Sequence, residues 1–351
     1  MPFGSGLNTL STLPYIAFRR IKWATCSDAS GSDCLTPKGF TFMRVALSTS
    51  TDNTTTAYAD FYNLHADAGT EAGDLTARQA NIAQVAAYIA QWSVGNAVVV
   101  YGDTNSRYTR AGDTAVRGLL SAGLADPWVE LRRGGVLPAV EDVCGNPADA
   151  NSTCEGVDKV FYRGSALVSL RAEAFRYDGG RFLQANGSVL SDHNPIFVQF
   201  AWEAGAGLRQ SAFSGGEDEG AWFSDVSVLA SVVKPRVATL TFRGGARLDS
   251  VGVTLTDGTT LRHGGTGGTE VALQLGSAEF WTEARLCRGD KSGKTRNFYI
   301  QAATSAGRTL TAGTATADCA TFAAPTGWQI VGFVGQDGDE MDQLAFVYAP
   351  R

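Results

Sequence analysis

The sequence is poor in charge, in histidine and in basic clusters. Charged residues make up 18% of the 351 residues, the formal net charge is −6, and three histidines occur. Lysine and arginine never form a run, which argues against a lasting electrostatic grip on nucleic acid. Transient binding of a single phosphate group needs no such run and stays open.

Proline is scarce and long apolar runs are missing. No stretch is long enough to span a membrane, and the start of the chain lacks the charged and apolar regions of a secretory signal peptide. The sequence contains 41 glycines and 10 prolines, a composition that favours tight turns over disorder. Hydrophobic residues reach 44%, enough for a packed core in each of two domains.

The cysteines lack the CxxC spacing of a zinc site. They form three pairs that are close in the sequence: Cys26 and Cys34, Cys144 and Cys154, Cys287 and Cys319. Asn-x-Ser/Thr sequons begin at Asn53, Asn151 and Asn186. Together these features favour a secreted, disulfide-bonded glycoprotein. The alternative is a cytosolic protein with free thiols. Because a secreted composition here comes without a signal peptide, we expect the natural N-terminus to lie upstream.

Residues 1–202 alternate between strand and helix patterns. Ile82, Val85 and Ile89 recur at helical spacing, so 75–92 is predicted as a helix with Asp74 as its cap. A second helix is predicted over 113–122, ended by Gly123. Strands are predicted at 58–64, 97–101, 158–162, 166–170 and 195–202.

The pattern changes after residue 202. Residues 203–220 are rich in glycine and acidic residues and are predicted as a linker. In residues 221–351 helical periodicity disappears, and an all-β domain is expected, with Asp257-Gly258 as a hairpin turn. Strands are predicted at 237–242, 250–255, 271–275 and 330–334.

Four short polar motifs lie at strand ends in the first domain. They are Asn63-Leu64-His65, Gly102-Asp103-Thr104-Asn105, Gly156-Val157-Asp158 and Ser191-Asp192-His193. Strand ends are where a sheet scaffold usually gathers a site. Carboxylates, amides and histidines are what phosphoryl chemistry needs, for binding a cation, activating water and holding phosphate oxygens. Each motif alone could equally be a turn or a buried structural residue.

Taken in order, the four motifs resemble those of the endonuclease/exonuclease/phosphatase family, whose fold is a four-layered α/β-sandwich. The resemblance covers about residues 1–202 and implies a role for each residue. His65 would contact the scissile phosphate and Asn105 would bind it. Asp103 would position or deprotonate the water. Asp158 would orient His193, the presumed base or acid.

The stretch from Gly6 to Phe40 looks most like the sphingomyelinase branch of that family, which favours a phospholipid substrate over nucleic acid. The resemblance also implies Mg²⁺ or Mn²⁺, with Asp192 at the metal and Asn63 shaping the site. The family's metal-binding glutamate precedes all of these motifs, and Glu71 cannot replace it by position. Two alternatives follow: the family's first strand and that glutamate lie upstream of this sequence, or the domain has lost them and has decayed.

The second domain resembles jacalin-related lectins, which are β-prisms of three four-stranded sheets. Ser214-Gly215-Gly216, His263-Gly264-Gly265 and the final G-x-x-x-D loop carry the likeness over about residues 208–351. Backbone N–H groups and a carboxylate can pair with vicinal sugar hydroxyls. The resemblance implies these sugar-binding residues: Gly215, Asp339, Glu340 and Asp342.

These observations leave three hypotheses for function. The first is a secreted Mg²⁺-dependent phosphodiester hydrolase of the sphingomyelinase or phospholipase C type, which its lectin domain would direct to glycan-bearing surfaces, with peripheral contact to membranes. The second is a catalytically impaired protein that acts as a lectin. The third is a secreted nuclease.

Overall fold

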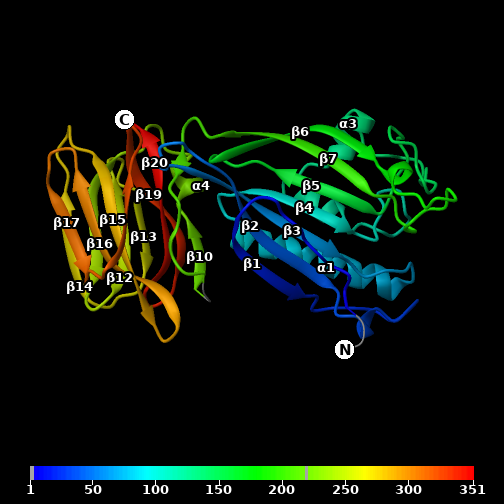
Figure 1. Ribbon diagram of the computed structural model, residues 1–351, viewed down its shortest axis with the longest axis horizontal. Coiled ribbons are helices and arrows are strands. Elements are labelled where there is room, and N and C mark those ends of the chain that lie inside the picture. The colour runs from blue at the N-terminus through cyan, green and yellow to red at the C-terminus, as the bar shows by residue number, and fades with distance from the viewer. Residues whose placement is uncertain (1–3, 218–219) are drawn as a thin grey trace. The chain divides into compact units, whose positions relative to one another are not determined.

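The computed structural model describes residues 4–217 and 220–351 and divides into two compact units. The first unit comprises Met1–Val45 and Ala59–Glu203, and the second comprises Ala46–Tyr58 and Ala204–Arg351. Figure 1 shows mixed helices and strands in the blue-to-green half of the chain and almost pure strand in the yellow-to-red half. This α+β architecture is the one predicted from the sequence.

A five-stranded sheet forms the centre of the first domain. Its strands run in the order β1-β2-β3-β4-β5. Strands β3 and β4 are parallel, whereas β5 runs antiparallel to β4. The last residues of β3 and β4 therefore lie beside the first residue of β5, at the same end of the sheet. The bounds are Tyr15–Lys22, Gly39–Thr49, Thr56–His65, Ala97–Asp103 and Asp158–Arg163.

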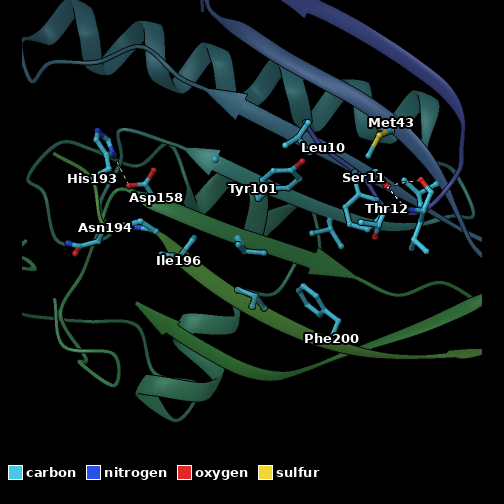
Figure 2. A pocket seen from close by; sticks show the side chains of 18 of the residues that line it. Leu10, Ser11, Thr12, Met43, Tyr101, Asp158, His193, Asn194, Ile196 and Phe200 are labelled. Carbon is cyan, nitrogen blue, oxygen red and sulfur yellow. Dashed lines mark hydrogen bonds and ion pairs between the residues drawn. The ribbon is translucent and has the colours of Figure 1, made fainter. Parts of the chain in front are cut away.

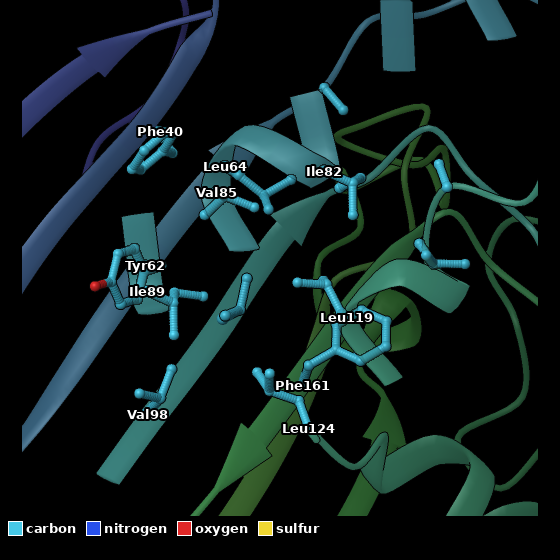
Figure 3. Close-up of a cluster of buried hydrophobic side chains, with 14 of the residues drawn as sticks. Phe40, Tyr62, Leu64, Ile82, Val85, Ile89, Val98, Leu119, Leu124 and Phe161 are labelled. Carbon is cyan, nitrogen blue, oxygen red and sulfur yellow. The ribbon is translucent and has the colours of Figure 1, made fainter. Parts of the chain in front are cut away.

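The two faces of this sheet are covered by different layers. On one face, Val98 and Val100 pack in a core with α1 (Ala72–Trp92) and α2 (Arg117–Ser121), shown in Figure 3. On the other face, Val99 packs towards a two-stranded sheet of β6 (Val168–Tyr177) and β7 (Ile196–Ala204). Successive side chains of β4 point to opposite faces of the sheet, so this strand contributes to both apolar cores. The helix α3 (Pro127–Arg133) packs on β6.

Both predicted helices are present with shifted starts. Helix α1 begins earlier than expected because Glu71, not Asp74, is its N-cap. Asp74 lies at the third helical position, and its carboxylate accepts a hydrogen bond from the Glu71 N–H at 3.1 Å, which completes a capping box. Helix α2 forms one short turn from Arg117, because residues 114–116 make only tight turns, and Gly123 follows it with φ of 83°.

The second domain is built from three sheets, as expected for a β-prism. One holds β10-β19-β20-β8 with β9 beside β20, one holds β13-β12-β11-β14, and one holds β17-β16-β15-β18. The rings of Phe333 and Phe346, from β19 and β20 of the first of these sheets, pack in a common core with the ring of Trp281, from β15 of the third sheet. The strands from β8 onward are Arg209–Gln210, Ser214–Gly215, Ala221–Ser224, Val237–Gly244, Leu248–Leu255, Thr260–Gly264, Thr269–Gln274, Trp281–Lys291, Lys294–Thr304, Thr309–Gly313, Asp318–Ala323, Trp328–Asp337 and Met341–Pro350.

Part of the expected linker belongs to this prism. Strands β8 and β9 fall within residues 203–220 and pair antiparallel with β20. Asp218 and Glu219 of the same segment lie outside the described residues. One short helix, α4 (Val226–Leu229), interrupts the otherwise all-β domain. The Asp257-Gly258 turn joins β12 to β13 as predicted, with Gly258 at φ of 91°.

All three expected disulfides form: Cys26–Cys34, Cys144–Cys154 and Cys287–Cys319. The third joins directly opposite residues of β15 and β18. Within residues 4–217 and 220–351, no helix is both long and apolar enough to cross a membrane.

Candidate active site and lectin loops

Three of the predicted site residues lie in one row at the edge of the central sheet. His65 ends β3 and is in register with Asp103, which ends β4. Asp103 is in turn paired with Asp158, the first residue of β5. The Nε2 atom of His65 lies 3.5 Å from Oδ2 of Asp103. Strand register therefore gathers an imidazole and two carboxylates from distant parts of the sequence.

His193 joins this row from the loop before β7. Its Nδ1 lies 2.7 Å from Oδ2 of Asp158, and its Nε2 lies 3.8 Å from Oδ2 of Asp103. Burial opposes a charge on His193, but the hydrogen bond and negative charge of Asp158 raise its pKa above the ordinary value. The pKa of Asp158 is also raised, first by burial and then by the nearby carboxylate of Asp103. The carboxylate of Asp103 is thus close enough to oppose the ionisation of Asp158.

The GDxN segment is held in shape by its own hydrogen bonds. Asn105 adopts φ of 50°, and its backbone N–H donates to Oδ1 of Asp103 at 2.8 Å. Its side-chain amide donates to Oδ2 of Asp103 and to the carbonyl of Ala66, both at 3.1 Å. A side chain at Gly102, with φ of 131°, would collide with the Leu64 carbonyl. Asn105 therefore fixes the Asp103 carboxylate.

The remaining predicted residues take different positions. Asn63 is buried, and its amide donates to the Asn8 carbonyl at 3.1 Å, so it anchors the N-terminal segment beside the site. Asp192 is exposed and contributes to the electrostatic environment of His193. In the described part of the chain, the group able to hold a metal consists of Asp103, Asp158 and His193, whose ligand atoms all lie within 4.8 Å of one another.

An apolar groove runs away from this site and was not predicted from the sequence. It has a volume of about 710 Å³. Figure 2 shows His193 and Asp158 at one end, Tyr101 and Ile196 along its length, and Met43 at the far end. Its walls are apolar side chains of β2, β3, β4, β5 and β7 that face one another between the two sheets: Val45, Phe61, Val99, Val160, Val198 and Phe200.

The predicted lectin residues divide into two groups. Gly215 in β9 pairs with Gln343, and a side chain at Gly215 would collide with the carbonyl of Asp342. These two residues are therefore in close contact. Asp342 is buried, and its carboxylate forms an ion pair with Arg296 at 3.0 Å from Nε.

The other two lie in the loop before β20. Glu340 is buried, and Oε1 of its carboxylate forms ion pairs with Arg247 and with Lys291, the latter at 2.6 Å. Asp339 is exposed in the same turn. The structure thus gives Glu340 two cationic partners and leaves Asp339 facing solvent.

The first domain has its candidate site at the ends of β3 and β4 and the start of β5, and the second domain is a β-prism. Comparison with known families agrees with this division. Residues 13–143 match the Endonuclease/Exonuclease/phosphatase family 2, and residues 213–347 match the Jacalin-like lectin domain. The chain therefore combines an endonuclease/exonuclease/phosphatase-family domain with a jacalin-like lectin domain.

Curated relatives share the first domain. Proteins named sphingomyelinase from Mycobacterium bovis and Mycobacterium tuberculosis are 36% identical over 204 residues. The match covers 58% of this chain and 38% of theirs. The first domain is accordingly sphingomyelinase-like in sequence, and the chain spans well under half the length of these relatives.

Solved structures resemble the second domain. A Malaysian banana lectin variant has 21% identity and a TM-score of 0.36, and covers 42% of this chain and 100% of its own. A mannose-binding jacalin-related lectin from Ananas comosus has 18% identity and a TM-score of 0.36, with the same coverage.

Proposed function

We propose that the first domain hydrolyses a phosphodiester, with His193 as general base and Asp158 as the residue that orients it. The observation that carries this proposal is the 2.7 Å contact between Nδ1 of His193 and Asp158. When that nitrogen donates its proton to the carboxylate, Nε2 carries the lone pair and can accept a proton from water. This is the base-and-orienter arrangement of many hydrolases.

The reaction then proceeds by attack of water on phosphorus. A bond forms between the water oxygen and phosphorus, the bond from phosphorus to the alcohol oxygen breaks, and the water proton passes to Nε2 of His193. The leaving alcohol oxygen takes up a proton from solvent water, and His193 later returns its proton to solvent, so that the products are an alcohol and a phosphomonoester. The imidazolium formed on His193 is stabilised by the neighbouring carboxylate of Asp158.

The donor set suits a divalent cation. Asp103 and Asp158 present carboxylate oxygens, the ligands that Mg²⁺ and Mn²⁺ prefer, and the charge of Asp103 opposes that of Asp158. We therefore propose that these two residues hold the metal, with Asp192 at its outer edge. A bound cation would neutralise phosphate charge and polarise the phosphoryl oxygen.

The apolar groove favours a lipid substrate over a polynucleotide. The polar end of the groove is the pair His193 and Asp158, here called the dyad, and its long walls are apolar. This lining fits a ligand with a phosphate and a hydrocarbon part. The similarity to proteins named sphingomyelinase points the same way. We propose sphingomyelin or a related phospholipid as the substrate class, which implies peripheral contact with membranes.

The second domain supplies a binding function of its own. We propose that it binds glycans through Gly215 and Asp342, with Asp339 at the rim, and so concentrates the hydrolase on glycan-bearing surfaces. The three disulfides and the lectin domain favour an extracellular protein.

The experiment that tests the hydrolase is a substrate panel with Mg²⁺. Sphingomyelin, phosphatidylcholine and plasmid DNA are incubated with the wild type and with His193→Ala. Release of a phosphomonoester from a lipid by the wild type alone supports the proposal. DNA nicking alone would replace it with the nuclease hypothesis, and inactivity on all three would leave the lectin as the function.

A further inference from the structure

A second cavity adjoins the catalytic pair. Its volume is about 270 Å³, and it shares Asp158, His193 and Asn194 with the apolar groove. The two cavities therefore meet at the dyad. Their linings differ in chemistry, because the smaller one is bordered by the guanidinium groups of Arg107 and Arg110, which the groove lacks. The rest of its lining includes the carboxylates of Glu155, Asp158 and Asp192 and the side chains of Val143 and Val157.

The arginines of this cavity are not balanced by the carboxylates that contact them. Arg107 pairs at 3.0 Å with Glu141, whose side chain is 53% exposed. Arg110 pairs at 3.2 Å with Asp113, and the buried Arg78 shares the same carboxylate at 3.1 Å. Three guanidinium groups thus contact two carboxylates.

Burial and hydrogen bonding reinforce this imbalance. Burial lowers the pKa of Arg110, and the positive charges of Arg107 and Arg78 lower it further. Among the described residues, the Nε atoms of Arg107 and Arg110 are buried and make no hydrogen bond to protein. Glu155, on the same cavity wall, already pairs with Lys159 at 3.0 Å. Buried donors without partners indicate a place for a ligand with acceptor oxygens.

We propose that this cavity is an anion subsite that binds the phosphorylated head-group half of the substrate through Arg107 and Arg110. The inference rests on the proposed function and refines it. With phosphorus at the dyad, where the two cavities meet, the hydrocarbon alcohol would lie in the apolar groove. The non-bridging phosphate oxygens would face Arg107 and Arg110 in the smaller cavity. Hydrolysis leaves a phosphomonoester, which carries more negative charge than the diester. The subsite therefore binds the product more tightly than the substrate's own phosphate.

Binding of inorganic phosphate and phosphocholine, measured by isothermal titration calorimetry with chelator present, tests the subsite without catalysis. Arg107→Gln should weaken the binding of both ligands by about tenfold, because it removes a charge-assisted contact. Arg107→Lys should restore part of it. Glu141→Gln should tighten binding, since Arg107 then lacks a competing carboxylate. Arg171→Gln, which changes an exposed arginine paired with Glu173, is the matched control and should bind as the wild type does.

The outcomes separate the subsite from the hydrolase proposal. Phosphate binding that persists in His193→Ala and falls in Arg107→Gln supports the subsite even if no hydrolysis is found. Wild-type protein that binds neither ligand at millimolar concentration would overturn it. Equal binding by the wild type, Arg107→Gln and Glu141→Gln would overturn it too, and because Glu141 is half exposed, that second variant should not disturb folding.

Discussion

Asp103 stands directly across from Asp158 in the register of β4 and β5, so that two carboxylates face one another at the edge of the sheet. Asp103 is the last residue of β4, and Asp158 is the first residue of β5. Burial raises the pKa of Asp158, and the negative charge of Asp103 raises it further. A cation bound between them would relieve this repulsion.

Cation binding should therefore depend on both carboxylates. We expect Asp103→Asn and Asp158→Asn each to weaken Mn²⁺ binding by at least about tenfold, because each removes one charged oxygen ligand. Electron paramagnetic resonance of free Mn²⁺ measures this directly. Asp149→Asn, at an exposed loop position, is the control. Wild-type affinity in both site variants would mean that the metal binds elsewhere.

The pKa of His193 should be higher than that of an ordinary histidine. Asp158 stabilises the imidazolium, so the pKa lies above the usual value of 6.5 and deprotonation occurs at higher pH. An NMR titration of the metal-free protein should show this, and Asp158→Asn should move the midpoint downward. The activity of the wild type should rise with pH as His193 loses its proton, because the base must be neutral. If Asp158→Asn left the midpoint of the His193 titration unchanged, the proposal that Asp158 orients His193 would be wrong.

Glycan binding should require Asp342 and should be limited by Arg296. Their 3.0 Å ion pair occupies the carboxylate that sugar hydroxyls would use. On a glycan array we expect Asp342→Ala to lose binding and Arg296→Gln to strengthen it. Asp318→Ala, which alters an exposed acid in the same domain, should leave the array unchanged. Undiminished binding by Asp342→Ala would place the sugar site elsewhere.

The stability of the first domain should depend on a buried ion pair. Arg44 and Asp60 are both buried and joined by two hydrogen bonds of 2.7 and 2.9 Å, and Ser93 and Asn96 also donate to Asp60. Asp60→Ala removes the carboxylate that balances the buried charge of Arg44 and should cost about 3–5 kcal/mol of unfolding free energy. Urea denaturation with Asp52→Ala, an exposed turn residue, as control measures this. A loss below about 1 kcal/mol, as seen for surface pairs, would contradict the assigned burial.

Much of the site follows from the sequence because its residues lie at strand ends. The apolar run at 97–101 fixes where β4 lies, and Asp103 is the first charged residue after it. His65 ends β3 and Asp158 begins β5. The 2.7 Å contact of His193 with Asp158 needs the loop before β7 to return to the sheet, and that follows only from the family resemblance.

Other features depend on tertiary packing and leave no local signal. The groove is lined by alternate residues of strands far apart in the sequence, each of which looks like ordinary core. The Arg107–Glu141 and Arg44–Asp60 pairs join residues that no spacing rule connects. Helix 113–122 was predicted too long, since its first residues turn inward, where Asp113 meets Arg78.

The most direct test of the central claim is ³¹P NMR of sphingomyelin vesicles treated with the protein and Mg²⁺. The account predicts that the phosphodiester signal is replaced by that of phosphocholine. It predicts that the rate falls by about a hundredfold to ten-thousandfold in His193→Ala, and that chelation of Mg²⁺ stops the reaction. A rate in His193→Ala equal to that of the wild type would contradict the assignment of the base, and with it the account of the site.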